Sequence, residues 1–330
     1  MVDTDSRPAA KQSSWWKLAF NLALLSGLVS IFVLQVQKNW NDIVNPQTWH
    51  ELRWDLAGVA LVILLFCSLL DILIWNRALS WFAAPLPFVK VAPVFIWSNL
   101  ARYIPGKVAS LFLRAALATE ADRPAVPVLA ASALELALRT ASALIIFVAT
   151  LPTWGRVAQH AKATEAFFIT GVIIIVVVLI CAHPKMMMPV LNWTLKKIKQ
   201  PIIEHTLRYR DVLGLIGLEM VRWVLVGISF VLLACAVYPP AWHAMLTLIG
   251  VANASWAAGF LSMTPAGLGM AEVVQNRVLA SSSLFGLRES SIIPVILPVA
   301  ARVWSLAAEG LWALAVWPLY YRWSRSTARK

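Results

Sequence analysis

The sequence predicts an all-α polytopic membrane protein with about six full transmembrane helices and two re-entrant helical hairpins in an inverted repeat. The first observation is composition: 60% of the 330 residues are hydrophobic and 13% are charged, which lies outside the range of soluble domains. The second is a set of apolar runs that approach the ~20 residues needed to cross a hydrocarbon core. The third is a pair of proline–glycine motifs inside further apolar stretches, with Pro105 and Pro265 lying 160 residues apart.

Six apolar runs are candidate spans, because each approaches, as a helix, the ~30 Å thickness of the hydrocarbon core. Many of the 17 tryptophans lie at the edges of these runs, where an aromatic belt is expected at the membrane interface. No small-residue cleavage site follows the first run, so we expect it to be retained; an uncleaved signal anchor with no further role is the alternative. The runs are Leu18–Val36, Leu56–Trp75, Ala125–Leu151, Ala166–Ala182, Leu215–Tyr238 and Ile292–Leu319.

Basic residues are distributed unevenly over the connections between the runs. With the N-terminus placed in the cytoplasm, sixteen Lys and Arg residues fall in inside segments and six in outside segments. Cytoplasmic loops of membrane proteins have such an excess, so both termini are predicted to be cytoplasmic. The formal net charge of +12 is then explained by orientation in a membrane rather than by nucleic-acid binding.

Two further apolar segments are interrupted, and each is predicted to be a re-entrant hairpin. The first, Val91–Ala118, has Pro105 and Gly106 near its middle, and its first limb is only about 15 Å long as a helix. A single crossing there would place the later six-charge loop outside, so a hairpin from the cytoplasmic side is favoured. The second segment, Ala244–Leu287, begins with a stretch that could almost span alone. A hairpin entered from the outer face is favoured because it keeps the basic C-terminus inside.

The two halves of this arrangement are expected to be related by inversion. Repeat 1 (about 55–151) runs inward, forms the first hairpin and returns outward, and repeat 2 (about 215–319) does the opposite. Inverted repeats whose discontinuous helices meet near the midplane are typical of alternating-access transporters. We therefore predict a single transmembrane domain at 15–320, between a cytoplasmic N-terminal tail at 1–14 and a basic cytoplasmic tail at 321–330.

The first proline–glycine motif is expected to bind an anion. A helix that restarts after Pro105 and Gly106 presents unpaired backbone N–H groups and the positive end of its dipole inside the membrane. Lys107 adds a full charge, and Arg102 and Arg114 lie nearby in the sequence, so a phosphate or carboxylate suits this place. The alternative is that Arg102 and Lys107 reach cytoplasmic headgroups because the hairpin is shallow.

The second motif is expected to form a tight turn followed by a helix. Gly267 and Gly269 permit a close approach of the backbone, and Glu272 falls in the first turn of the following helix. There the carboxylate stabilises the positive end of the helix dipole. The alternative hypothesis is that a protonatable Glu272 couples proton movement to substrate movement, or receives an amine.

Other charges within the predicted spans have helix-compatible spacing. Glu135 and Arg139 are four residues apart, a favourable intrahelical pair that either is structural or faces the substrate. Arg302 and Glu309 are seven apart on one face of the last span. Because Arg302 has no close partner within its own helix, it is the stronger functional candidate of that span.

Three more charged residues lie within the spans. Asp71 stands alone near a span end and is expected to reach the membrane interface. Glu219 and Arg222 are three residues apart, a helix-compatible spacing, near the cytoplasmic end of their span.

The motifs taken together resemble those of a known family. They are Asn99…Tyr103-Ile104-Pro105-Gly106-Lys107…Arg114, Glu135…Arg139 and Pro265-Ala266-Gly267-Leu268-Gly269…Glu272. At these positions, and over about 15–320, the chain resembles the lysylphosphatidylglycerol synthase transmembrane family, also called the flippase-like family. The resemblance implies an integral membrane protein that moves anionic or glycan-bearing lipids between leaflets, including aminoacylated phospholipids and polyprenyl-phosphate-linked sugars.

The chain also departs from that family. Ala109 and Ser110 stand where many relatives have Gly-Glu, so a carboxylate role at that place is not transferred. The soluble aminoacyl-transferase domain of full-length synthases is not found in this sequence, so lipid synthesis by that route is not implied.

The function expected from these features is that of a lipid flippase in the bacterial inner (cytoplasmic) membrane. Its cargo would be an anionic or polyprenyl-phosphate-linked (glyco)lipid, whose headgroup binds near the midplane. Membrane lipids of this kind are the expected partners, with a glycosyltransferase or envelope-assembly protein as a further one. The residues expected to bind the headgroup are Asn99, Arg102, Pro105, Gly106, Lys107, Arg114, Glu135, Arg139, Pro265, Gly267, Gly269, Glu272, Arg302 and Glu309.

Two alternatives to transport stay open at this stage. One is an accessory or scaffold protein for envelope glycolipid assembly, and the other is an intramembrane enzyme acting on lipid phosphates. The five histidines are unclustered in the sequence, and the three cysteines lie inside predicted spans without a CxxC pair. No catalytic residue, cofactor or metal site is therefore predicted.

Overall fold

The computed structural model describes residues 52–82, 84–103, 109–154, 183–197, 208–262, 264, 267, 269–280 and 293–327, with short pieces between 169 and 180. Every regular element in these ranges is helical, as predicted. The expected span at 18–36 and most of that at 166–182 lie outside the described residues.

Five helices are long and apolar enough to cross a membrane, which makes the chain an integral membrane protein. Four of them, α4, α7, α10 and α13, match predicted spans to within one residue at the ends where the predicted span is the longer. The fifth joins a short 3-10 turn, η2, to α11; it is the segment for which the sequence favoured a hairpin limb, and by length it can also cross. The helices are α4 (Trp54–Trp81), α7 (Ala125–Trp154), α10 (Tyr209–Val237), η2 with α11 (Trp242–Leu261) and α13 (Ile293–Thr327).

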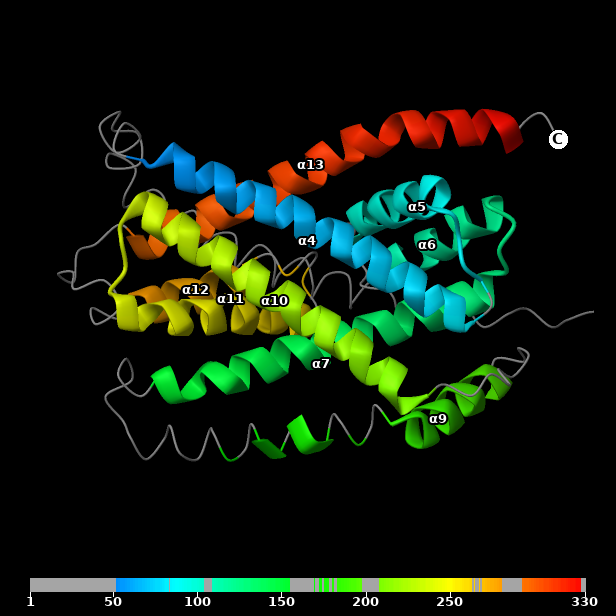
Figure 1. Ribbon diagram of the computed structural model, residues 1–330, viewed down its shortest axis with the longest axis horizontal. Coiled ribbons are helices and arrows are strands. Elements are labelled where there is room, and N and C mark those ends of the chain that lie inside the picture. Colours follow the sequence, from blue (N-terminus) through cyan, green and yellow to red (C-terminus); the bar gives the residue numbers. More distant parts are fainter. Residues whose placement is uncertain are drawn as a thin grey trace, which may run out of the picture.

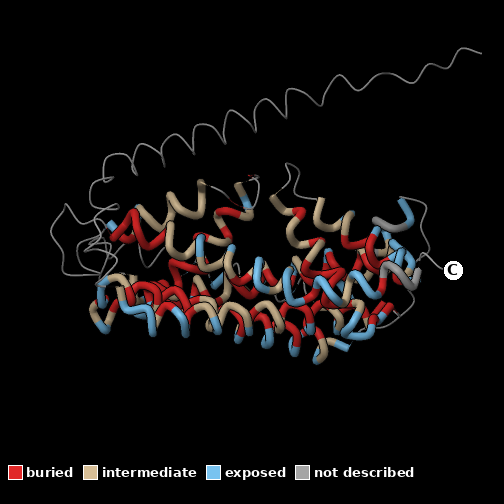
Figure 2. Tube along the Cα trace, turned by 90° about the horizontal axis from the view of Figure 1, so that it is seen from above, coloured by how far each residue is buried: buried red, intermediate tan, exposed pale blue. Residues whose placement is uncertain are grey.

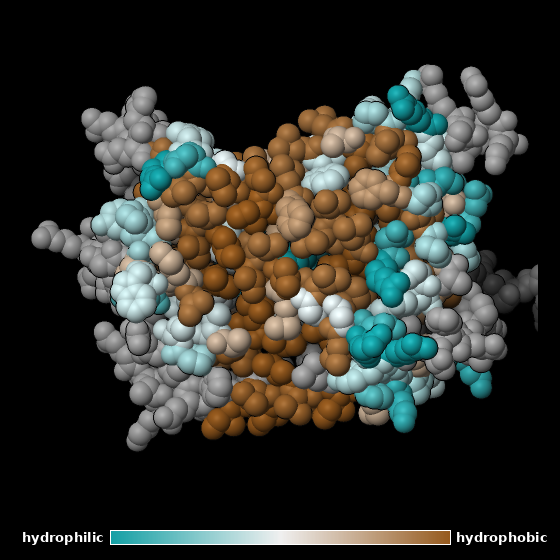
Figure 3. Space-filling model, in the orientation of Figure 1, coloured by the Kyte–Doolittle hydropathy of each residue, from teal (hydrophilic) through white to brown (hydrophobic). Residues whose placement is uncertain are grey.

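The long helices run side by side along the longest axis of the molecule (Figure 1). An apolar band covers the middle of the face shown in Figure 3, and polar residues gather at its two ends. On α4 the outward side chains Val59, Val62, Phe66 and Leu73 are exposed at helical spacing. Such a large exposed apolar surface marks contact with lipid.

One end of the bundle is strongly basic, and we call it the basic end. There α4 and α13 finish, and α7 and α10 begin (Figure 1). The short helix α9 (Pro184–Lys197) also lies at this end. The opposite end has Arg53 and Arg277 among the described residues. Basic side chains at the basic end are Arg77, Lys90, Arg123, Lys185, Lys196, Lys197, Arg208, Arg210 and Arg322.

Two helix pairs enter the bundle from opposite ends. α5 (Phe88–Leu100), the turn η1 (Ala101–Tyr103) and α6 (Ala109–Glu120) lie together at the basic end (Figure 1). At about 20 and 18 Å, α5 and α6 are too short to cross a bilayer. Lys90 of α5 and Asp122 beyond α6 are 4.0 Å apart, so both limbs start and finish at the same end.

The second pair consists of α11 (Met245–Leu261) and α12 (Met270–Leu279). Both lie towards the opposite end of the bundle (Figure 1). Near the finish of α12, the side-chain amide of Asn276 donates to the backbone carbonyl of Pro294, at the start of α13, over 2.9 Å. The tips of the two pairs therefore point towards each other from opposite ends.

Two apolar clusters form the core. The cluster at the basic end includes Ile216 of α10 and Val316 of α13, and the other includes Phe230 and Leu297 of the same two helices. Buried residues accordingly line the inside of the bundle along its length (Figure 2). Glu219 and Arg222 of α10, and Arg302 and Glu309 of α13, lie between these pairs of positions, so the interior charges occupy a layer between the clusters.

Candidate functional site

Six buried charged side chains meet between α4, α6, α7 and α10, and we call them the inner network. Each comes from the apolar interior of a helix, where a charge is costly without a partner. Their side chains are between 0 and 10% exposed. The members are Asp71, Arg114, Glu135, Arg139, Glu219 and Arg222.

Arg139 is at the centre of the inner network. Its Nη2 atom donates to Asp71 Oδ1 over 2.6 Å and lies 2.5 Å from Glu135 Oε1. Its Nε atom lies 3.6 Å from Glu219 Oε1. The predicted intrahelical pair of Glu135 and Arg139 is thus present, but the same guanidinium also joins α7 to α4 and α10.

The other two arginines complete the charge balance. Arg222 pairs with Asp71, and its Nη1 atom lies 4.0 Å from Glu219 Oε2. Arg114 Nη1 donates to Glu135 Oε2 over 3.2 Å, and its guanidinium carbon is 4.4 Å from the centre of the Phe95 ring. Three positive and three negative groups therefore compensate one another, which is what burial in a low-dielectric interior requires.

One expectation about these residues was wrong. Asp71 does not reach the interface: it is buried, and its two arginine partners come from other helices. Glu219 and Arg222 form the pair that their spacing indicates, and in addition Glu219 faces Arg139 and Arg222 faces Asp71. The sequence shows no close partner for Asp71, because both of its arginine partners lie far away along the chain. The one indication in the sequence is that a single acidic residue in an apolar helix needs a charged partner from another helix.

A separate ion pair joins the tip of the first hairpin to α13. Arg102 of η1 pairs with Glu309, and the Tyr103 hydroxyl donates to Glu309 Oε2 over 3.1 Å. The side chains of Arg102 and Glu309 are 33% and 14% exposed, so this pair is more open than the inner network. Arg102 therefore faces a partner inside the bundle rather than the headgroups.

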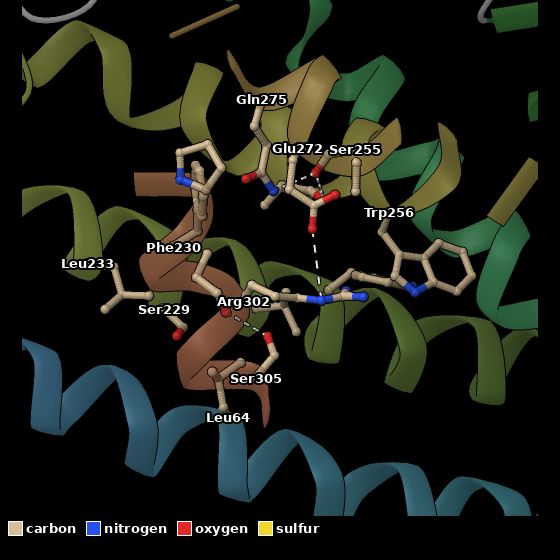
Figure 4. A pocket seen from close by; sticks show the side chains of 16 residues that line it. Leu64, Ser229, Phe230, Leu233, Ser255, Trp256, Glu272, Gln275, Arg302 and Ser305 are labelled. Atoms are coloured by element: carbon tan, nitrogen blue, oxygen red, sulfur yellow. Dashed lines mark hydrogen bonds and ion pairs between the residues drawn. The ribbon is translucent and has the colours of Figure 1, made fainter. Parts of the chain in front are cut away.

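A second ion pair joins the tip of the second hairpin to α13. Glu272 Oε1 lies 3.8 Å from Arg302 Nε, and Figure 4 shows these two side chains pointing towards each other. The backbone N–H of Gly269 donates to the other carboxylate oxygen of Glu272 over 2.8 Å, so the predicted role at the helix start is confirmed. Gly267 and Gly269 have φ angles of 71° and 86°, as the predicted tight turn requires.

One face of α13 thus holds both hairpins. Arg302 and Glu309 lie two turns apart, about 10 Å along the helix. Their partners are Glu272 of α12 and Arg102 of η1. The spacing showed that the two side chains share a face, but it did not show that they contact different hairpins.

A cavity of about 280 Å³ lies where the hairpin tips and the inner network meet. A polar spot is visible at the centre of the apolar face in Figure 3. Aromatic side chains, Trp223, Trp256 and Phe260, form part of the wall. The predicted site residues that line this cavity are Asn99, Arg102, Arg114, Glu135, Arg139, Gly267, Arg302 and Glu309.

A smaller cavity of about 140 Å³ adjoins it and shares Trp256, Arg302 and Ser305 with it. Glu272 lines this second space, together with polar side chains such as Gln275 (Figure 4). The Glu272–Arg302 pair therefore lies at the boundary between the two spaces.

The remaining predicted residues fall elsewhere. Gly269 lines neither cavity but starts α12. Pro105, Gly106, Lys107 and Pro265 lie outside the described residues. In the part of the chain that is described, no group of three or more His, Cys, Asp or Glu side chains is placed to hold a metal ion.

Comparison of the chain with protein-family models, with curated proteins and with solved structures finds no match. The resemblance to the flippase-like family therefore stays a prediction that rests on the sequence motifs.

Proposed function

We propose that the protein is a lipid transporter of the flippase type, which binds the phosphate-bearing headgroup of an anionic lipid and passes it between leaflets. The observation on which the proposal rests is a charged cavity, between two hairpin tips, inside a bundle whose outer surface is apolar. Charged residues at such depth are costly and mark substrate pathways. A polyprenyl-phosphate-linked glycolipid belongs to the same cargo class, and the bacterial inner membrane is the proposed location.

The chemistry of the cavity supports an anionic headgroup. Two arginines, Arg102 and Arg302, contribute to the cavity wall and are 33% and 23% exposed. Arginine presents a planar fork of donors that matches the oxygen atoms of phosphate. A polar headgroup can lie among these residues while the hydrocarbon tail stays in lipid.

The arrangement of the helices supports an inverted repeat. In the first half, α4 leads to the basic end, the α5–α6 hairpin enters from there, and α7 returns (Figure 1). In the second half, α10 leads away from the basic end, the α11–α12 hairpin enters from the opposite end, and α13 returns. We propose that the basic end faces the cytoplasm and that both hairpins are re-entrant.

Cysteine labelling tests this orientation. In a variant whose native cysteines are replaced by serine, we expect Trp242→Cys to react with a membrane-impermeant maleimide on intact bacterial cells. Asp122→Cys should react only after the cells are permeabilised. Both positions are open to solvent, with Trp242 80% exposed and the Asp122 side chain 83% exposed. Labelling in the reverse order would contradict the proposed orientation, and labelling of both in intact cells would contradict the placement of these two positions on opposite sides of the membrane.

Reconstitution tests transport itself. Vesicles that contain the protein and a fluorescent phosphate-headgroup lipid should lose all of their fluorescence when a membrane-impermeant reductant is added. Vesicles without protein should lose only the outer-leaflet half. We expect Arg302→Gln to slow the exchange by at least about tenfold, the effect of losing roughly 1.4 kcal/mol of binding to the headgroup. Arg77→Gln, at an exposed position near the basic end, is the matched control and should exchange normally.

The same experiment separates the alternatives. Absence of exchange for phosphate-headgroup and glycosylated lipids alike would contradict the transport proposal and favour a scaffold. Release or transfer of a radiolabelled headgroup would instead favour an intramembrane enzyme.

A further inference from the structure

The two ion pairs at the hairpin tips differ from the inner network in their accessibility. The inner side chains are at most 10% exposed, and the arginine at their centre faces three carboxylates. The pairs Arg102–Glu309 and Arg302–Glu272 include arginine side chains that are 33% and 23% exposed and line the cavity. A ligand in the cavity can therefore reach these two arginines without unpacking the buried charges.

Tyr103 brings the two accessible arginines to one place. The guanidinium carbon of Arg102 lies 5.2 Å from the centre of the Tyr103 ring, and that of Arg302 lies 5.9 Å from the same centre. The two carbons are consequently no farther apart than the sum of these distances. Two linked phosphates can contact both guanidinium groups over such a span, and a single phosphate can contact either of them.

Each of these arginines faces a carboxylate across the contact between α13 and a hairpin tip. Glu309 of α13 faces Arg102 of η1, and Glu272 of α12 faces Arg302 of α13. A carboxylate and a phosphate offer an arginine the same kind of paired oxygen acceptors. They therefore compete for the same donors.

We propose that Glu309 and Glu272 pair with Arg102 and Arg302 in the empty transporter, where they take the place of the ligand. An incoming phosphate group displaces them. The displacement breaks the ion pairs that join α13 to η1 and to the start of α12, which are the tips of the two hairpins. Ligand binding then favours a state in which both hairpins are free to move relative to α13. The nature of the ligand as a lipid rests on the proposed function, whereas the competition for the arginines does not.

The competition predicts that removal of a carboxylate from the site raises the affinity for an anionic ligand. Glu309→Gln and Glu272→Gln should each tighten the binding of an anionic ligand by about tenfold, equivalent to 1.4 kcal/mol, because each removes a negative competitor. Arg102→Gln and Arg302→Gln should weaken it by a similar factor. Glutamine keeps the side-chain oxygen that accepts from Tyr103, and at position 272 it keeps the acceptor for the Gly269 N–H, so the fold is expected to survive.

The experiment is a calorimetric titration of the full-length protein, in uncharged maltoside micelles, with dodecyl phosphate. Glu120→Gln is the matched control: it makes the same change of net charge at an exposed position at the finish of α6 and should leave the affinity unchanged. Size-exclusion profiles and melting temperatures identify any variant that is misfolded. A parallel titration with inorganic phosphate distinguishes a lipid headgroup site, which prefers dodecyl phosphate, from a site for free phosphate.

Two results would overturn the inference. One is that the folded Glu309→Gln and Glu272→Gln variants bind dodecyl phosphate no more tightly than wild type. The other is that Glu120→Gln tightens binding as much, which would assign the effect to net charge. Tighter binding in the two cavity variants without leaflet exchange in vesicles would support the inference and contradict transport. Leaflet exchange without tighter binding would do the opposite.

Discussion

Replacement of Arg139 by glutamine should lower the free energy of unfolding by about 3–5 kcal/mol, the cost of breaking a buried ion pair by removing one partner. Arg139 faces Asp71, Glu135 and Glu219. Without it, three buried carboxylates are left with two arginines, and the inner network has a net negative charge on side chains that are at most 10% exposed. The measurement is the fraction of protein that stays folded in detergent micelles over a denaturant or temperature series.

Two further variants give this prediction its controls. Arg77→Gln removes an exposed arginine and should change stability by no more than about 0.5 kcal/mol. Glu219→Gln combined with Arg139→Gln restores the charge balance, so the double variant should be more stable than Arg139→Gln alone. Strictly additive effects in this double-mutant cycle, or a stable Arg139→Gln protein, would contradict a compensated buried network.

The inner network also indicates which part of the molecule is rigid. It joins α4, α6, α7 and α10 through buried charges, whereas the hairpin tips are attached to α13 by the more accessible pairs. Separation of charges in the inner network is costly, and separation of the Arg102–Glu309 and Arg302–Glu272 pairs costs less because their side chains are more exposed. In the proposed transport cycle, movement is therefore expected at the tips and α13, while the other helices stay fixed relative to one another.

Local patterns in the sequence predicted much of this architecture. Four apolar runs form long helices, because a segment of about 20 apolar residues in lipid must satisfy its backbone hydrogen bonds internally, as a helix does. The pair of Glu135 and Arg139 follows from helical spacing alone. The turn at Gly267 and Gly269 follows from the conformations that only glycine adopts easily.

Partners far apart along the chain could not be predicted in the same way. Asp71 has no charged neighbour within a helical turn, so its pairing with Arg139 and Arg222 depends on how α4, α7 and α10 pack. The division of Arg302 and Glu309 between two hairpins likewise depends on where the tips lie. A single sequence predicts which face of its helix each charged residue occupies, but the contacts between helices depend on tertiary packing.

Substitution of Gly267 by alanine should cost about 2–5 kcal/mol and disturb the tip of the second hairpin. The φ angle of 71° is unfavourable for a residue with a Cβ atom by roughly 1–2 kcal/mol. An added Cβ would also lie 2.9 Å from the Cα atom of Gly259, and overpacking of this kind costs about 1–3 kcal/mol. Because the opposing atom belongs to the backbone of α11, it cannot swing away as a side chain would.

A series of glycine substitutions separates the two causes. Gly259→Ala places its Cβ 3.1 Å from the Gly267 Cα atom in a helical conformation. The contact cost of about 1–3 kcal/mol is then partly offset by the gain of about 0.5–1 kcal/mol for alanine in a helix, so the loss should be smaller than for Gly267→Ala. Gly58→Ala, within α4 where nothing lies within 4 Å of the added atom, should raise stability by about 0.5–1 kcal/mol. Unfolding midpoints in detergent should therefore fall in the order Gly58→Ala, wild type, Gly259→Ala, Gly267→Ala. A Gly267→Ala protein as stable as wild type would show that the two limbs of the hairpin do not approach each other at this point.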